Sequence, residues 1–438
     1  MSEKINRRDF VKTAGVAAAS TIFAPAIVTA QAAPKRYALV GTGHRGTGMW
    51  GKDLVTKYSG ELKFVGLCDT NHKRVLVGKE LIGADCPTFT NLDEMLEKAK
   101  PEILMVTTVD SSHHEQIVRA LSKGIDVITE QPMVTEAAQA QAIMDAEKRY
   151  NRKITVAFNY RYSPKHQKMK EILDSGEIGK ITSVDFSWYL DVRHGADYFR
   201  RWHRLKSKGG SLWVHKATHH FDLVNWWISG DPVEVTAYGA LNVYGKNGPF
   251  RGKNCRSCEY KTKCPFYWDI TKNERLVKLY PNCEDVDGYY RDGCVFREDC
   301  DIYDTMSAIV KYNNGVNMTY SLNAHEPFEG YRIAFNGTKG RMEVRDYERQ
   351  SWESEHRTDV SVSVNFGERR QVEIPVVSGG HAGGDDRLRD AIFKNAPMPD
   401  VLKLPGSRAG TMSCLTGIAA RTSIEQNRPV KIAELIKL

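Results

Sequence analysis

A glycine-rich turn between a short apolar strand and an amphipathic segment constrains this chain more than any other feature. The residues "YALVGTGHRGTGMWGKDL", 37–54, pass through Gly41, Gly43 and Gly46 into helical spacing. Glycines at this spacing let a backbone approach a pyrophosphate, and the free N–H groups of the following helix attract its negative charge. The same spacing also fits a turn that only closes a β-α-β unit, so its meaning depends on the next strand and the residue that ends it.

An acidic residue lies at the distance that a dinucleotide site requires. The stretch "ELKFVGLCDT" alternates as a second buried strand and ends at Asp69, 23 residues after Gly46. A carboxylate there accepts the two adenosine ribose hydroxyls and repels a 2′-phosphate, which favours NAD over NADP. The neighbouring His72, Lys73 and Arg74 weaken that preference without reversing it.

Alternating strands and helices continue to about residue 158. The apolar runs "EILMVTT", "DVITE" and "ITVAFNY" are typical of parallel strands that are covered on both faces. Ligands of such sheets bind at the carboxyl ends of the strands. Those ends carry the segments 107–110, 130–132 and 159–161, which are polar and therefore predicted to form a site.

The N-terminus predicts export. Arg7 and Arg8 precede a short apolar run that ends in small residues, the pattern of a twin-arginine signal over residues 1–33 and of a periplasmic protein. An ordinary N-terminal helix is the alternative. The run is too short for a membrane span, and no later segment supplies one. The remaining chain of about 400 residues suits two domains, and a net charge of +8 without a long basic run argues against nucleic acid.

Three segments together resemble the Gfo/Idh/MocA oxidoreductases: "GTGHRG", "SSHHEQIVRALSKGIDVITEQPM" and "GGSLWVHKATHHFDLVNWWISGDP". The resemblance implies an α/β fold, with a Rossmann domain over residues 34–158 and a second α/β domain over 159–438. It implies that the second domain has an open, mostly antiparallel sheet, whose face covers the nicotinamide and often contacts another subunit. A sugar or polyol substrate and a homo-oligomer are therefore expected.

The resemblance and the strand ends together define the expected cofactor contacts. These are Gly41, Gly43, His44, Arg45, Gly46, Asp69, Thr107, His113, Glu130, Gln131 and Pro132. His113 stands in the position of the family's histidine. Gln131 stands where the family usually has lysine, and an amide can hydrogen-bond but cannot act as acid or base.

The expected catalytic residues come from the third segment. His219 occupies the family's catalytic position, with Asp222 in register. Lys216 lies three residues before His219, so on a helix the two share a face, and the lysine could lower the histidine pKa and donate to a developing oxyanion. His215 joins this cluster where many family members have aspartate. The alternative is that His219 is a core histidine bonded to Asp222.

The substrate contacts are predicted from polar and aromatic residues near the same strand ends. Residues 194–210, "HGADYFRRWHRLKSKGG", are interpreted as a loop whose aromatic rings and guanidinium groups could hold a sugar, or else as a solvated basic loop. A glycine-flanked histidine later in the chain could close the pocket. The expected contacts are Tyr160, Arg161, Arg201, His203, Asp222 and His381.

Six of the nine cysteines cluster within residues 250–300, which we interpret as an insertion. The spacing C-x(2)-C-x(5)-C in the first half suits either a structural zinc site or disulfides, and the second half completes neither signature. The residues concerned are Cys255, Cys258, Cys264, Cys283, Cys294 and Cys300. The isolated Cys68, Cys86 and Cys414 are predicted to pack as apolar side chains.

Three functions remain open on the sequence. The leading one is an exported NAD-dependent oxidoreductase of a sugar or polyol, with the cofactor tightly bound and recycled in the site, because free nicotinamide nucleotide is not available outside the cytoplasm. The second is a glycosidase that oxidises the sugar, eliminates the leaving group, adds water and reduces again. The third is a sugar-binding or sensing protein without catalysis. The histidine–lysine cluster argues against this third function.

Overall fold

The computed structural model describes residues 33–351, 357–375, 377–394 and 399–437. Residues 34–438 form one compact unit, the second of the two into which the chain divides. Except for Ala33, the predicted export signal lies outside the described residues. Among the helices that the structure describes, none is both long and apolar enough to cross a membrane.

The N-terminal part of the second unit contains a six-stranded parallel sheet in the order β3-β2-β1-β4-β5-β6. Its strands are β1 Lys35–Val40, β2 Leu62–Cys68, β3 Thr88–Phe89, β4 Ile103–Val106, β5 Asp126–Thr129 and β6 Ile154–Val156. The accompanying helices are α2 His44–Thr47, a π-helical turn Gly48–Lys52, α3 Asp53–Lys57, α4 His72–Ile82, α5 Leu92–Ala99, α6 His113–Ser122 and α7 Ala137–Tyr150. The strand order reverses at β1 and β4, where doubly wound sheets bind their ligands.

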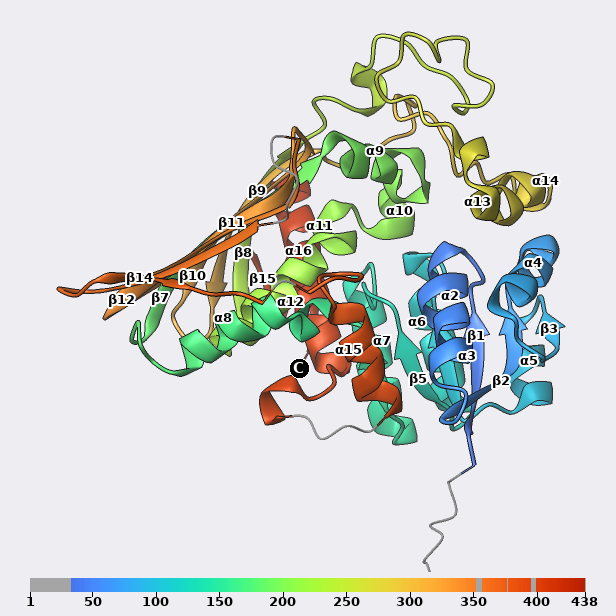
Figure 1. The fold of residues 1–438 in the computed structure, drawn as a ribbon, viewed down its shortest axis with the longest axis horizontal. Coiled ribbons are helices and arrows are strands. Elements are labelled where there is room, and N and C mark those ends of the chain that lie inside the picture. Colours follow the sequence, from blue (N-terminus) through green and yellow to red (C-terminus); the bar gives the residue numbers. More distant parts are fainter. Residues whose placement is uncertain (1–32, 352–356, 376, 395–398, 438) are drawn as a thin grey trace, which may run out of the picture. The chain divides into compact units, whose positions relative to one another are not determined.

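The rest of the chain forms a nine-stranded sheet in the order β14-β13-β12-β11-β7-β10-β9-β8-β15 (Figure 1). Its strands are β7 Ile181–Asp191, β8 Pro232–Ala240, β9 Thr305–Tyr312, β10 Asn317–Glu326, β11 Glu329–Gly337, β12 Gly340–Arg349, β13 Arg357–Val364, β14 Arg369–Val372 and β15 Val430–Lys431. Only the β7–β10 pair is parallel among the described strands of this sheet. The predicted fold class, a Rossmann domain followed by an α/β domain with a mostly antiparallel sheet, is confirmed.

Helices cover one face of this sheet and carry much of the site. They are α8 Pro164–Asp174, α12 Ala217–Ile228 and α16 Ser407–Gln426, with the shorter α11 Leu212–His215 and α17 Ile432–Leu435. Helix α15 Gly384–Phe393 packs instead into the core of the Rossmann domain. Helix α12 packs against α16, and α16 packs against β8, so their apolar faces join one large core. The strand β9 alternates buried and exposed residues, as expected for a sheet with one covered face.

The stretch predicted as a loop over residues 194–210 is largely helical, and that prediction was wrong. It contains α9 Val192–Arg200, a 3₁₀ turn Trp202–Arg204 and α10 Lys206–Gly209. Asp191 caps α9 by accepting hydrogen bonds from the amides of Arg193 and His194. A Cβ on Gly195 would lie 1.7 Å from the Ala324 carbonyl oxygen, so this glycine lets the helix approach β10 instead of breaking it.

Residues 241–304 form the insertion between β8 and β9. Its first part is irregular, and its second part contains α13 Glu274–Leu279 and α14 Glu284–Asp287. Helix α13 packs against α4 of the Rossmann domain (Figure 1). In the sequence, the insertion therefore lies between two strands of the second sheet. In the folded protein, it contacts the Rossmann domain.

Candidate active site

The glycine turn after β1 is shaped by close contacts that only glycine permits. Gly41 has a φ of +94°, and a Cβ there would lie 2.6 Å from the Thr107 carbonyl oxygen. A Cβ on Gly46 would lie 2.1 Å from the Gly41 carbonyl oxygen. The Thr107 hydroxyl donates to the same Gly41 oxygen at 2.7 Å. Thr107 therefore supports the turn, and the start of α2 is held directly over the end of β1.

Asp69 lies at the end of β2 beside this turn, as its position in the sequence predicts. One carboxylate oxygen accepts the amide of Thr42 at 3.0 Å, and the other accepts the amide of Asn71 at 2.9 Å. The guanidinium of Arg74 lies 3.4 Å from the carboxylate and also binds Asp287. Arg74 is thus shared between two carboxylates.

The insertion covers the glycine turn. The amide of His44, at the start of α2, donates to the Tyr280 hydroxyl at 2.9 Å. Arg275 donates to the His44 carbonyl at 3.2 Å and to the Thr47 hydroxyl at 2.8 Å. A Cβ on Gly43 would lie 3.3 Å from the Tyr280 hydroxyl, so glycine makes room for this hydroxyl against the turn.

A second set of contacts anchors the same segment to α4. Asn71 donates to the Cys283 carbonyl at 2.8 Å, and Arg74 donates to the Leu279 carbonyl at 3.2 Å. Apolar side chains of α4 pack against those of α13 in a small separate core. We call residues 270–288 the cap. The sequence did not predict it, because nothing local indicates that Tyr280 and His44 are neighbours.

The environment of the turn is strongly cationic and suits an anionic ligand. The pKa of His44 is lowered to about 4, first by burial and then by the charges of Arg275, Arg291, Arg201 and Arg45. A neutral His44 leaves those guanidinium groups as the positive charges around the turn. The glycine cradle at the start of α2 and these positive charges fit the pyrophosphate of a dinucleotide.

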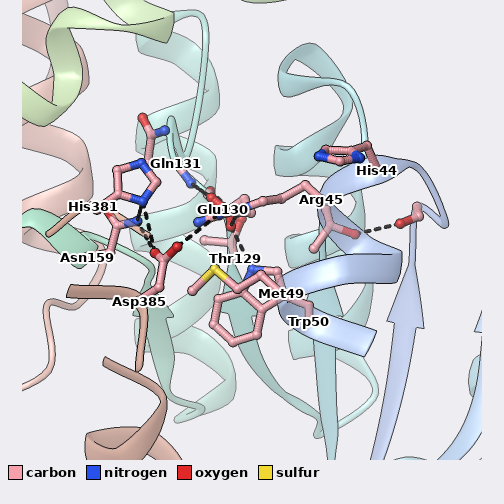
Figure 2. Close-up of polar contacts among 12 residues, drawn as sticks. His44, Arg45, Met49, Trp50, Thr129, Glu130, Gln131, Asn159, His381 and Asp385 are labelled. Carbon is pink, nitrogen blue, oxygen red and sulfur yellow. Dashed lines mark hydrogen bonds and ion pairs between the residues drawn. The ribbon is translucent and has the colours of Figure 1, made fainter. Parts of the chain in front are cut away.

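A chain of polar contacts links the Rossmann domain to the start of α15 (Figure 2). Glu130 accepts from Arg45 Nε at 2.5 Å and from the indole N–H of Trp50 at 2.6 Å. Arg45 also lies 3.6 Å from Asp385, which accepts from Asn159 at 2.6 Å. Two of the predicted cofactor contacts, Arg45 and Glu130, therefore pair with each other.

His113, Gln131 and Pro132 meet at the end of β5. The ring of His113 is buried, with Nδ1 2.9 Å from the Pro132 carbonyl oxygen and Nε2 3.2 Å from the Thr108 carbonyl oxygen. His113 thus ties α6 to the strand ends. The side-chain oxygen of Gln131 is buried and has no hydrogen-bond partner within the described chain. An unsatisfied buried acceptor of this kind fits a hydroxyl or amide donor of a ligand.

His219 lies in the first turn of α12, in contact with other predicted site residues. Its ring is 4.7 Å from the Tyr160 ring and 6.0 Å from that of His381, and its Nδ1 has no partner within the described residues. Burial lowers the pKa of His219 well below its ordinary value, and the charge of Lys216 lowers it further. The imidazole is therefore neutral near physiological pH and can accept a proton.

Lys216 precedes α12 and is 5% exposed. Its ammonium lies 4.8 Å from the Trp188 ring and 5.7 Å from that of Tyr160, and it forms no ion pair within the described chain. Burial lowers the pKa of Lys216. The effect of Lys216 on His219 agrees with the electrostatic role proposed from their spacing.

Asp222 does not bond to His219. Its carboxylate accepts both Arg161 Nε, at 2.7 Å, and Arg161 Nη2, at 2.6 Å. The alternative of a core histidine bonded to Asp222 is therefore wrong. Asp222 binds Arg161 and not His219, because the planar guanidinium group forms two parallel hydrogen bonds with the carboxylate.

His215 and His203 belong to a neighbouring aromatic cluster. His215 Nδ1 lies 2.6 Å from Asp110, and its ring is 4.1 Å from that of His203. His203 stacks on Trp202 at 3.6 Å and is 1% exposed, with both ring nitrogens unpartnered among the described residues. Burial lowers the pKa of His203 well below its ordinary value.

The remaining predicted contacts lie around this centre. Arg201 pairs with Asp197 at 3.0 Å, and Arg291 shares that carboxylate at 2.6 Å, which leaves a net positive charge on the group. His381 Nδ1 lies 3.1 Å from Asp385, and its ring is 5.1 Å from that of Tyr160. His381 is thus close to both Tyr160 and His219.

All nine cysteines are free thiols in the structure. Cys68, Cys86 and Cys414 are buried, as expected for apolar packing. Burial raises the pKa of Cys68 to about 12 and that of Cys86 to about 11, so neither is a reactive thiolate.

Comparison with known proteins identifies the family. Residues 35–158 match the model of the oxidoreductase family's NAD-binding Rossmann fold, and residues 170–432 match that of its C-terminal alpha/beta domain. YteT of Bacillus subtilis, named as an oxidoreductase, is 38% identical over 430 residues, which are 92% of this chain and 99% of YteT. An inositol 2-dehydrogenase of Gluconacetobacter diazotrophicus is 28% identical over 200 residues, 45% of this chain and 56% of that enzyme.

A solved structure supports the fold. The aldose-aldose oxidoreductase of Caulobacter crescentus, crystallised with glycerol, is similar with a TM-score of 0.61 at 16% identity, over 91% of this chain and 99% of the other. The fold, the glycine turn and the family matches agree. The chain belongs to the Gfo/Idh/MocA family of oxidoreductases.

Proposed function

We propose that this protein is an exported NAD-dependent oxidoreductase of a sugar or polyol that keeps its dinucleotide bound between turnovers. The observation that carries the proposal is the cap: Tyr280 and Arg275 lie on the glycine turn, where they would hold the pyrophosphate in place. The neutral His219 and the buried Lys216 supply the acid–base groups.

In the proposed reaction, His219 accepts a proton and Lys216 stabilises a developing negative charge. When bound, the nicotinamide accepts a hydride from the substrate carbon. The neutral imidazole of His219 takes the proton of the reacting hydroxyl, which its low pKa and unpartnered Nδ1 permit. Lys216, which has no carboxylate partner within the described chain, donates to the oxygen as negative charge develops.

The choice of NAD over NADP rests on the charges beside the adenosine ribose. Asp69 favours free ribose hydroxyls. Arg74 is a cation next to Asp69, and it is already paired with Asp69 and Asp287. A 2′-phosphate would therefore meet two carboxylates for one guanidinium.

Retention of the nucleotide agrees with a reaction that recycles it. The name of the Caulobacter protein describes an oxidoreductase that acts between two aldoses. The inositol dehydrogenase relatives act on a polyol by name. A periplasmic location after twin-arginine export would make such recycling necessary, because fresh nucleotide is scarce there.

A redox-neutral glycosidase is the second candidate, and Gln131 favours it. The residue lies at the end of β5 where the family usually has lysine, and its buried oxygen is unpartnered within the described residues. An amide can orient a sugar hydroxyl but cannot shuttle its proton. A dehydrogenase and a glycosidase of this kind would share His219, Lys216 and the retained cofactor.

One assay separates these functions. The full chain is purified, its bound nucleotide is identified after denaturation, and the protein is incubated with free sugars, polyols and aryl glycosides. Net formation of NADH, or transfer between two sugars, supports the oxidoreductase; release of the aglycone without net redox change supports the glycosidase. A chain that binds no nicotinamide nucleotide refutes both.

Self-association is part of the proposal. The outer face of the large sheet exposes Tyr238 on β8 and Ile309 on β9, with 70% and 54% of their surfaces accessible. The register pairs Thr236 with Ile309, so Tyr238 and Ile309 share one face. Ile309→Lys should lower the mass measured by light scattering if this face joins two copies, and an unchanged mass would exclude it.

A further inference from the structure

The cysteine-rich half of the insertion folds around one short backbone pairing. An isolated antiparallel bridge joins Asn254 to Gly293, and the amide of Cys255 donates to the Asp292 carbonyl at 2.8 Å. The bridge places Cys255 opposite Asp292 and Cys294 opposite Lys253, and both cysteines line one cavity although 39 residues separate them in the sequence. The C-x(2)-C-x(5)-C segment thus acquires a fourth cysteine from the second half.

Two tight turns bring the other cysteines to the same place. The amide of Cys258 donates to the Cys255 carbonyl at 3.3 Å, and the amide of Cys264 donates to the Tyr260 carbonyl at 2.9 Å. Cys255, Cys258, Cys264 and Cys294 all line one cavity. Phe250, Phe266 and Val295 form apolar parts of its wall.

Hydrogen-bond donors surround the sulfur atoms. Arg200 donates to Cys255 Sγ at 3.2 Å, and the amide of Phe296 donates to Cys294 Sγ at 3.4 Å. The amide of Phe266 donates to the sulfur of Cys264. Arg200 is buried, and with Lys261 it adds positive charge at the cavity. Such donors and cations stabilise thiolates and the anionic centres that thiolates bind.

A single metal ion and a metal cluster place different demands on four thiols. A tetrahedral zinc ion with bonds of about 2.3 Å draws its four sulfurs to within about 3.8 Å of one another. Throughout the described residues, no three His, Cys, Asp or Glu side chains are arranged to hold one metal ion. Four cysteine thiols that line one cavity match the Cys₄ ligand set of an iron–sulfur cluster, in which several iron atoms share the thiolates.

We propose that Cys255, Cys258, Cys264 and Cys294 ligate an iron–sulfur cluster. The cluster occupies the cavity, each thiolate binds an iron, and the apolar wall shields the centre from water. It joins the two halves of the cysteine-rich segment, and through the insertion it supports the cap. This site is separate from the proposed catalytic centre, and its existence does not depend on which sugar is the substrate.

The two other cysteines of the insertion provide matched controls. Cys283 donates to the Lys278 carbonyl at 3.3 Å within the cap, and Cys300 is buried elsewhere in the insertion. Neither lines the cavity. Replacing either removes a thiol from the same segment without removing a ligand.

The test is metal and sulfide analysis of the full chain, purified without oxygen and also reconstituted with ferrous iron and sulfide. We expect about two or about four irons per chain with equal acid-labile sulfide, and the visible absorption of thiolate-bound iron. Cys258→Ser and Cys294→Ser should lose most of the iron, whereas Cys300→Ser and Cys283→Ser should keep it.

Several results would overturn the proposal. They are zinc in place of iron, disulfides among the four cysteines under anaerobic conditions, or no iron and sulfide after reconstitution. Iron that persists in both ligand variants would also overturn it. The iron and sulfide analyses use the unaltered protein, so they test the proposal even if the serine variants fail to fold.

Discussion

Replacing Tyr280 by phenylalanine tests whether the cap holds the dinucleotide. The substitution removes only the hydroxyl that lies 2.9 Å from the His44 amide. With the nucleotide bound, that hydroxyl is expected to donate to a phosphate oxygen. A hydrogen bond to a charged group contributes about 1.5–3 kcal/mol, and each 1.4 kcal/mol is tenfold in affinity. We therefore expect Tyr280→Phe to weaken NAD binding by about 10- to 150-fold.

The assay is calorimetric titration of the nucleotide-free protein, with release of bound nucleotide followed after dilution. Tyr290→Phe is the matched control, because Tyr290 lies in the same insertion and contacts Lys253 through its ring. The control should bind NAD as the unaltered protein does. If Tyr280→Phe binds NAD as tightly as Tyr290→Phe and releases it no faster, the cap does not touch the pyrophosphate.

Three further substitutions test the site and its support. Lys216→Met removes a charge that lowers the pKa of His219; because the active base is neutral, the acidic limb of the kcat/KM profile should move to higher pH. Arg161→Met leaves the buried Asp222 carboxylate uncompensated and should lower the free energy of unfolding by about 3–5 kcal/mol, measured by denaturant titration. Gly46→Ala forces a Cβ against the turn and should abolish NAD binding in the same titration.

Each of these has a control. If the acidic limb of the kcat/KM profile does not move in Lys216→Met, the lysine does not control the pKa of His219. Adding Asp222→Leu to Arg161→Met should restore stability, since both charges are then gone; no recovery would contradict the ion-pair argument. Gly367→Ala adds a Cβ that makes only ordinary contacts of 3.5 Å or more, and it should leave NAD binding intact. Equal loss of binding in Gly367→Ala would show that the effect of Gly46→Ala is not local.

The first sheet and its glycine turn could be predicted because their signals are local. Apolar strands, a turn of glycines and Asp69 come one after another within about 35 residues, and each step has a short-range physical reason. Gly41 illustrates this, since its positive φ is a property of the turn itself. The nine-stranded sheet was expected from the family resemblance, since periodicity alone does not order its strands.

The contacts that could not be predicted from the sequence join distant parts of the chain. Tyr280 and His44 are 236 residues apart, and Arg161 and Asp222 are 61 apart. The residues around each partner form no motif, so no sequence pattern predicts that the two are in contact. The α9 helix was not predicted for a related reason: Gly195 resembles a loop residue until β10 is placed against it.

The position of the cap has a kinetic consequence. Helix α13 and Tyr280 belong to a segment inserted between two strands of the large sheet, yet they close over the first turn of the Rossmann fold. If the dinucleotide binds at this turn, as proposed, it can leave only after this segment detaches from α4. Its residence time would then depend on how often the insertion opens locally. Substitutions far from any ligand atom could therefore change how long one NAD molecule stays bound.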